Sequence, residues 1–232
     1  MIPISDNIYI RKKPIVCFWL IGINLALFLW ELKLEFSGDL DDFVNSWGVI
    51  PAQINQAIAN LPLNPAAIVI VAWRLISMPL AMFVHGSFSQ ILGNLLFLWV
   101  FGKTVENSLG TGRFLGFYLL CGIFTGFVQI IAEPSLTVPL IGANGAIASI
   151  LGAYILKFYK AKIYTVLPLL IIFIPIELPA FFYIFWWFVQ QLFYGIGSLN
   201  IVGGVNPGSI GYWAHGAGLI MGAVAMHRLQ RR

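Results

Sequence analysis

Apolar runs long enough to cross a membrane recur along the chain, and they limit its fold more than any other feature. Residues 14–32 hold one charged side chain, and about 20 mostly apolar residues suffice for a helix to span a bilayer core. No small-residue cleavage site follows this run, so we interpret it as a retained first span rather than a signal peptide. Further apolar runs occupy residues 90–104, 114–132, 143–158, 164–195 and 212–228. Only 9% of the 232 residues are charged, against about a quarter in soluble domains, which predicts a polytopic membrane protein.

The run at 164–195 is longer than one span and contains three prolines, so its topology has two solutions. It forms two spans, or one span preceded by a kinked or re-entrant piece, because proline disfavours a continuous helix. With six spans and the N-terminus inside, eleven Lys and Arg residues fall in inside segments, and only Lys33 and Arg74 fall outside. Two spans in this run would move the last three arginines outside and weaken the positive-inside pattern. The sequence therefore favours six spans.

The predicted organisation is one membrane domain with short flanking segments. We expect a cytoplasmic N-terminal arm at residues 1–13, an all-α domain of six membrane helices at 14–228, and a cytoplasmic tail at 229–232. Within the domain, residues 33–74 form a long first outer loop, whose aromatic and amphipathic composition is typical of segments in the membrane interface. We expect a multi-pass protein of a plasma membrane of the bacterial type, with both termini cytoplasmic.

Several classes of function are disfavoured by the composition. The excess of basic residues is explained by membrane topology, so nucleic acid is not an expected partner. Cys17 and Cys121 both fall in apolar runs, which indicates neither a disulfide framework nor a metal site. Three histidines are too few clustered donors for a metal centre. We therefore expect no metal and no cofactor, and the oligomeric state is left open.

Polar residues gather on the outer side of the predicted bundle. His85, Gln90 and Asn94 lie at or just before the outer half of the second span. Asn144 opens the fourth span from outside, and His215 lies about one turn into the sixth. Each could be an isolated polar contact between helices, worth about 0.6 kcal/mol. Their shared depth favours one common site, because polar groups inside a membrane are costly and mark functional positions.

Small residues follow the same two helices at a spacing of four. This spacing lets helix backbones approach closely, so it predicts that the fourth and sixth spans pack together. Such packing would bring His215 within reach of the side chain at position 144. The small residues are Gly145, Ser149 and Ala153 in the fourth span, and Ala214, Gly218 and Gly222 in the sixth.

The order and spacing of these motifs resemble the rhomboid intramembrane serine proteases over roughly residues 73–226. The matching segments are FVHGSFSQILGN, LLFLWVFGKTVENSLG, FYLLCG, PLIGANGAIASILGAY and WAHGAGLIMG. The resemblance implies six helices around a water-accessible cavity that opens to the outer side. In active members a Gly-x-Ser-Gly motif, which begins here at Gly142, supplies the nucleophile. By the same resemblance, His215 is the general base, Asn94 holds the oxyanion, and His85 is structural.

Two positions depart from the family's pattern. Asn144 stands where the family has its serine, and Gln90 stands where it has a second oxyanion residue, a histidine. A glutamine can still donate an N–H, but a carboxamide nitrogen has no proton that a histidine can usefully remove, and nucleophilic catalysis needs an activated nucleophile. Asn144 is either natural or introduced to inactivate the protein. The second change at Gln90 favours a natural origin.

We therefore expect a non-proteolytic rhomboid-like protein that lies in the bilayer and binds single-pass transmembrane proteins as clients. The alternative is an active intramembrane serine endopeptidase that cleaves such proteins with an unrecognised nucleophile. A small transporter is less consistent with the chain, because it lacks internal repeats and a charged path across the membrane.

Overall fold

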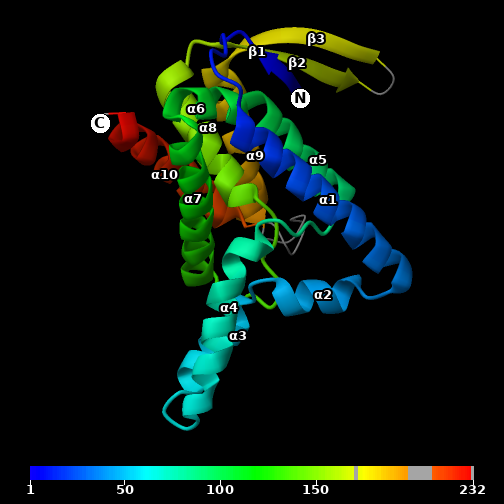
Figure 1. The fold of residues 1–232 in the computed structure, drawn as a ribbon, viewed down its shortest axis with the longest axis vertical. Coiled ribbons are helices and arrows are strands. Elements are labelled where there is room, and N and C mark those ends of the chain that lie inside the picture. The colour runs from blue at the N-terminus through cyan, green and yellow to red at the C-terminus, as the bar shows by residue number, and fades with distance from the viewer. Residues whose placement is uncertain (170–171, 198–210, 231–232) are drawn as a thin grey trace.

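A computed structural model describes residues 1–169, 172–197 and 211–230, and it shows a helix bundle with a small sheet at one end (Figure 1). The strands are β1 (Ile2–Asp6), β2 (Lys162–Leu169) and β3 (Ile172–Pro179). The helices are α1 (Ile15–Ser37), α2 (Leu40–Trp47), α3 (Pro51–Asn60), η1 (Pro65–Ala67), α4 (Ile68–Ala81), α5 (Phe88–Phe97), η2 (Leu98–Gly102), α6 (Lys103–Leu109), α7 (Thr111–Ala132), α8 (Asn144–Phe158), α9 (Ala180–Gly197) and α10 (Tyr212–Gln230).

Three helical segments of the described chain are long and apolar enough to cross a membrane. They are α1, the continuous segment Phe88–Leu109 and α7. The second segment joins α5 to α6 through the π-helical turn η2. Helix α8 is also apolar but has only 15 residues. The expected spans are therefore found as helices near their predicted positions, whereas six membrane crossings stay a prediction.

The expectation of an all-α fold is wrong, because a three-stranded antiparallel sheet is present. The apolar run at 164–195 contains most of β2, all of β3 and most of helix α9. Strands β2 and β3 form a hairpin that begins at Lys162. Strand β1, from the expected N-terminal arm, pairs with β2. A short apolar run bounded by prolines fits a buried strand as well as a helix, so hydropathy alone did not separate the two. The Asp6 carboxylate fixes β1 to the bundle, because it accepts hydrogen bonds from the Thr104 hydroxyl (2.7 Å) and the Tyr154 hydroxyl (2.9 Å).

Helix α1 is capped by a residue far away in the sequence. Pro14, at its N-cap, provides no side-chain hydrogen bond. The Glu106 carboxylate of α6 instead accepts from the backbone N–H of Val16 (3.0 Å) and of Cys17 (2.7 Å). A carboxylate is favourable here because the first N–H groups of a helix lack partners and carry the positive end of its dipole.

The predicted close pairing of the fourth and sixth spans is confirmed by the packing of α8 on α10. A methyl group added to Gly152 would overlap the Leu219 carbonyl, and one added to Gly222 would overlap the Ser149 carbonyl. Only glycine fits where two backbones approach this closely. We call this contact the α8–α10 seam, formed by Gly145, Ser149 and Gly152 against Gly218, Leu219 and Gly222.

The predicted first outer loop contains α2, α3, η1 and the first half of α4, and Arg74 holds part of it together. The Arg74 guanidinium is largely buried and donates to the backbone carbonyls of Asn45, Ser46 and Gly48 at 2.7–3.0 Å. It also donates to the Gln53 side-chain oxygen. These bonds fix the end of α2 and the start of α3 against α4.

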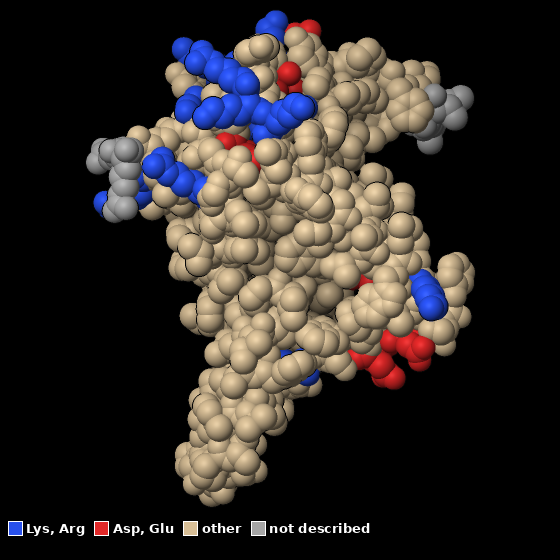
Figure 2. Space-filling view, in the orientation of Figure 1, with Lys and Arg blue, Asp and Glu red and all other residues tan. Residues whose placement is uncertain are grey.

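Lys and Arg side chains gather, together with a few acidic ones, at the end of the molecule that carries the sheet (Figure 2). A second group, mostly acidic, lies near α2. The middle of this face shows almost no charge. The membrane orientation expected from the positive-inside pattern stays a prediction.

Candidate functional site

A cavity of about 420 Å³ lies between α5, α8, α9 and α10, and four of the predicted site residues line it. These four are Gln90, Asn94, Asn144 and His215. They come from α5, α8 and α10, so the structure brings together residues more than 100 positions apart in the sequence. The remaining lining residues are Gly86, Ser87, Ser89, Gly93, Phe97, Ile141, Ile147, Trp187 and Gln191.

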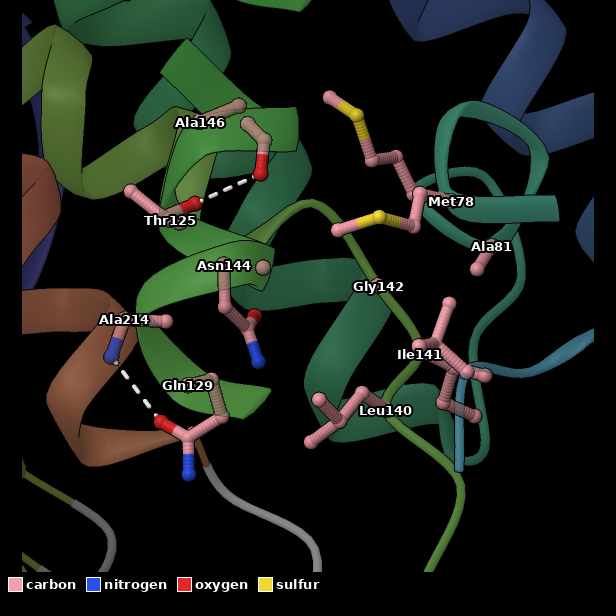
Figure 3. A pocket seen from close by; sticks show the side chains of 16 residues that line it. Met78, Ala81, Thr125, Gln129, Leu140, Ile141, Gly142, Asn144, Ala146 and Ala214 are labelled. Atoms are coloured by element: carbon pink, nitrogen blue, oxygen red, sulfur yellow. Dashed lines mark hydrogen bonds between the residues drawn. The ribbon is translucent and has the colours of Figure 1, made fainter. Parts of the chain in front are cut away.

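Asn144 is the first residue of α8 and is positioned by the turn before it. Gly142 has φ +91° and donates its N–H to the Ala81 carbonyl at 2.8 Å. This left-handed backbone suits glycine, and a methyl group there would also contact the Gln90 amide nitrogen. Asn144 also lines a second, smaller cavity of about 70 Å³. In Figure 3 its carboxamide points between Gln129 and Leu140, and no hydrogen bond is drawn to it from the residues that line this cavity.

His215 is buried in α10, and its ring is oriented by a residue that the sequence analysis missed. Its Nδ1 lies 2.7 Å from the Gln191 side-chain oxygen on α9. An amide oxygen only accepts, so Nδ1 carries the hydrogen and the Nε2 lone pair is left for another partner. The rings of Trp187 and Tyr212 lie 5.5 Å and 6.3 Å from the imidazole, centroid to centroid. Gln191 could have been identified as a glutamine inside an apolar run, because a polar residue is costly in a membrane helix.

Gln90 is occupied in holding two loops together. Its side-chain oxygen accepts from the Gly86 N–H at 2.9 Å, and its Nε2 donates to the Ile141 carbonyl at 3.2 Å. One of its two amide hydrogens is therefore already used. Only the other amide hydrogen of Gln90 is left for the oxyanion donor that the sequence analysis expected.

Asn94 is held by His85, which lies behind the cavity and does not line it. Asn94 Nδ2 is 3.1 Å from His85 Nε2, while His85 Nδ1 is 3.2 Å from the Phe83 carbonyl. Nδ1 therefore donates and Nε2 accepts. The backbone N–H of His85 donates to the Glu31 carboxylate of α1 at 3.1 Å. These contacts agree with the structural part expected for His85, and they add the buried Glu31, which the sequence analysis did not single out.

The start of α10 is fixed by α7 close to the site. The Gln129 side-chain oxygen accepts from the Ala214 N–H at 3.0 Å, as the dashed line in Figure 3 shows. The Gln129 amide nitrogen in turn donates to Glu133 at 2.8 Å. The residue next to His215 is therefore tied to a rigid helix. Among the described residues, no three His, Cys, Asp or Glu side chains are grouped to hold a metal ion.

Comparison with known proteins places this site in a family context. A family model of the rhomboid domain matches residues 71–232. The mouse protein "Presenilin-associated rhomboid-like protein, mitochondrial" is 30% identical over 129 residues, which is 55% of this chain and 32% of the mouse protein. The Bacillus subtilis "Rhomboid protease GluP" is 38% identical over 81 residues, 35% of this chain and 15% of that protein. The "Putative rhomboid protease YdcA" of the same organism is 34% identical over 83 residues, 36% of this chain and 40% of that protein.

The matched region spans about a third of the length of the mitochondrial relatives. The relatives include mitochondrial and bacterial proteins, so they do not assign a membrane to this chain.

Proposed function

The chain belongs to the rhomboid family, and from this premise we propose that it is a non-proteolytic member that binds transmembrane helices of partner proteins. The observation that carries the proposal is the pairing of Asn144 with His215 in one cavity. His215, at the base position, keeps a lone pair on Nε2. Asn144, at the nucleophile position, carries only amide protons, which a histidine cannot usefully remove.

The chemistry at position 144 argues against peptide cleavage. The Asn144 nitrogen is conjugated with its carbonyl, so it is a poor nucleophile, and the Nε2 lone pair of His215 cannot activate it. In a serine protease, loss of the nucleophile lowers turnover on the order of a millionfold. A remaining oxyanion donor does not restore the missing step.

Gln90, at the position of the family's second oxyanion residue, also supports a non-proteolytic function. Gln90 spends its oxygen on Gly86 and one N–H on Ile141, so it acts as a brace between two loops. An active site that stabilises a transition state keeps its hydrogen-bond donors pointed at the charge that develops there. Here one of the two Gln90 amide hydrogens is used for holding the loops of the cavity.

The cavity nevertheless suits a peptide segment that enters from the lipid. Its wall between α5 and α9 includes the rings of Phe97 and Trp187, whose centroids are 6.1 Å apart. Asn144 both donates and accepts hydrogen bonds, and Nε2 of His215 accepts one. A client helix that unwinds at this depth exposes backbone N–H and C=O groups, which these side chains would satisfy.

The alternative function is that of an active serine endopeptidase, and the printed names of two relatives favour it. The candidate nucleophiles are Ser87 and Ser89, which line the same cavity as His215. Ser87 caps α5 by accepting from the Gln90 N–H, and its hydroxyl lies 3.1 Å from that of Ser89. Ser149 is excluded, because it is buried in the seam and donates to the Gly145 carbonyl.

The test uses the full chain in lipid nanodiscs, unaltered for cleavage and labelling and with a photoreactive residue in place of Trp187 for binding. A single-pass test substrate with a Gly-Pro pair in its transmembrane helix is offered beside a fluorophosphonate probe, and binding is followed by photo-crosslinking from position 187. We expect crosslinking of the test substrate without cleavage or probe labelling. Cleavage or labelling that His215→Ala abolishes would overturn the proposal, and loss of that signal in Ser89→Ala would identify the alternative nucleophile.

A further inference from the structure

The tip of the β2–β3 hairpin carries exposed apolar side chains on both faces. Ile172 and Phe173 are 61% and 62% exposed, and successive residues of a strand point to opposite faces of the sheet. A sheet that packs one face on a protein core alternates apolar with polar residues. This tip does not alternate, so both of its faces call for an apolar environment.

The base of the same hairpin is polar. Lys162 and Glu177 form an ion pair at 3.1 Å, and both side chains are about half exposed. Each strand has eight residues, so the tip lies roughly 25 Å from the base at the usual rise of a strand. The hairpin therefore passes along its length from a water-exposed ion pair to an apolar end.

Three prolines remove N–H donors from the edges of the hairpin that no other strand covers. Pro168, Pro175 and Pro179 lie opposite Phe173, Val166 and Lys162. These pairs fall in one alternating set of the antiparallel ladder. Because proline has no N–H to donate, this is the set whose N–H positions point away from the partner strand. The outer edges of the hairpin thus lack an N–H donor at three positions. This disfavours the addition of another strand, and it lowers the free-energy cost of moving the hairpin out of water.

Basic residues flank the sheet on its two connections to the bundle. Arg11, Lys12 and Lys13 lie between β1 and α1, and Lys160 lies just before β2. The backbone N–H groups of Arg11 and Lys12 donate to the Asn107 side chain of α6, which holds this segment at the same end. Figure 2 shows Lys and Arg gathered there. Such clusters attract anionic lipid headgroups.

We propose that the β2–β3 hairpin is a lipid anchor. Its apolar tip enters the boundary between headgroups and acyl chains in the leaflet at the basic end of the bundle, and the flanking basic residues contact anionic headgroups. The hairpin extends sideways from the end of the bundle, across the direction of α7, as an element along a membrane surface must (Figure 1). This role is independent of whether the cavity cleaves peptides.

The test measures the depth of nitroxide labels in vesicles of phosphatidylcholine mixed with phosphatidylglycerol. Labels are attached to full-length Phe173→Cys and Ile172→Cys, with Glu177→Cys as the control at the base of the same strand. The unaltered chain controls for background, because Cys17 and Cys121 are buried. We expect tip labels to collide more with oxygen than with a water-soluble nickel chelate, and the reverse at position 177.

Two results would overturn the insertion of the tip. They are tip labels as open to the nickel chelate as the label at 177, or protection of only one of the two tip labels, which would mean a hairpin lying flat on one face. The headgroup contact is tested in phosphatidylcholine alone, where we expect weaker protection of the tip. Unchanged protection would overturn that part of the proposal.

Discussion

The two walls of the cavity that hold the site are built in different ways. The α8–α10 seam brings two backbones together through glycines that leave no space for a methyl group. The opposite wall, between α5 and α9, includes the rings of Phe97 and Trp187. Ring centroids lie 5.8–6.2 Å apart where Phe97 and Phe101 pack against Tyr183 and Trp187. The seam holds together the backbones of α8 and α10, which carry positions 144 and 215, whereas the aromatic wall packs through side chains and orients the His215 ring through Gln191. The site therefore keeps a rigid frame although its nucleophile position holds a carboxamide.

The largest effect is expected at the seam. Gly222→Ala places a methyl group on the Ser149 carbonyl, and we expect a loss of about 3 kcal/mol in the free energy of unfolding, the upper range for overpacking. The matched control is Gly216→Ala on the same helix, where nothing lies within 4 Å of the added methyl. It should be neutral or stabilising. Unfolding in mixed micelles by titration with dodecyl sulfate measures both, and equal stabilities would contradict the rigid seam.

The next effect concerns Gln191, which links the two walls by orienting His215 from α9. In a chain made catalytic by Asn144→Ser and Gln90→His, we expect Gln191→Leu to lower the rate on the order of tenfold, the lower range for losing a group that orients a histidine. Gln191→Glu keeps an acceptor for Nδ1–H and should retain most activity. The exposed neighbour offers the control Gln190→Leu, with no change expected. Fluorophosphonate labelling rates measure this series, and an equal loss in the Gln190 and Gln191 variants would refute the orienting role.

The smallest effect is expected at the aromatic wall. Trp187→Ala should cost about 1 kcal/mol in the free energy of unfolding, the size of an aromatic pair contact, because lipid tails can replace the lost ring. The same titration measures it. A cost equal to that of Gly222→Ala would show that both walls are equally rigid and would remove the contrast between them.

The sequence predicted the helices and the grouping of the site better than it predicted the end of the bundle that carries the sheet. The apolar runs and the four-residue spacing of small residues depend on local pattern, so α7, α8 and the seam followed from them. The residues around Ile163 and Ile174 are apolar enough for either a strand or a helix, and the pairing of β2 with Ile2–Asp6 is a long-range contact that no local pattern contains.

The partners of the site residues were also not predictable, for the same reason. Gln191 reaches His215 across 24 positions, and Glu106 caps α1 across about 90. The sequence shows that burying these polar residues costs free energy, but it does not show which groups they hydrogen-bond.

The central claim is that the frame of a rhomboid protease is intact here and only the chemistry at positions 144 and 90 is missing. It is tested most directly by fluorophosphonate labelling of the full chain carrying Asn144→Ser and Gln90→His in nanodiscs, beside the unaltered chain. We predict labelling of the restored chain, its loss when His215→Ala is added, and none in the unaltered chain. A folded restored chain that stays unlabelled would contradict the intact frame, and labelling of the unaltered chain would contradict the missing chemistry.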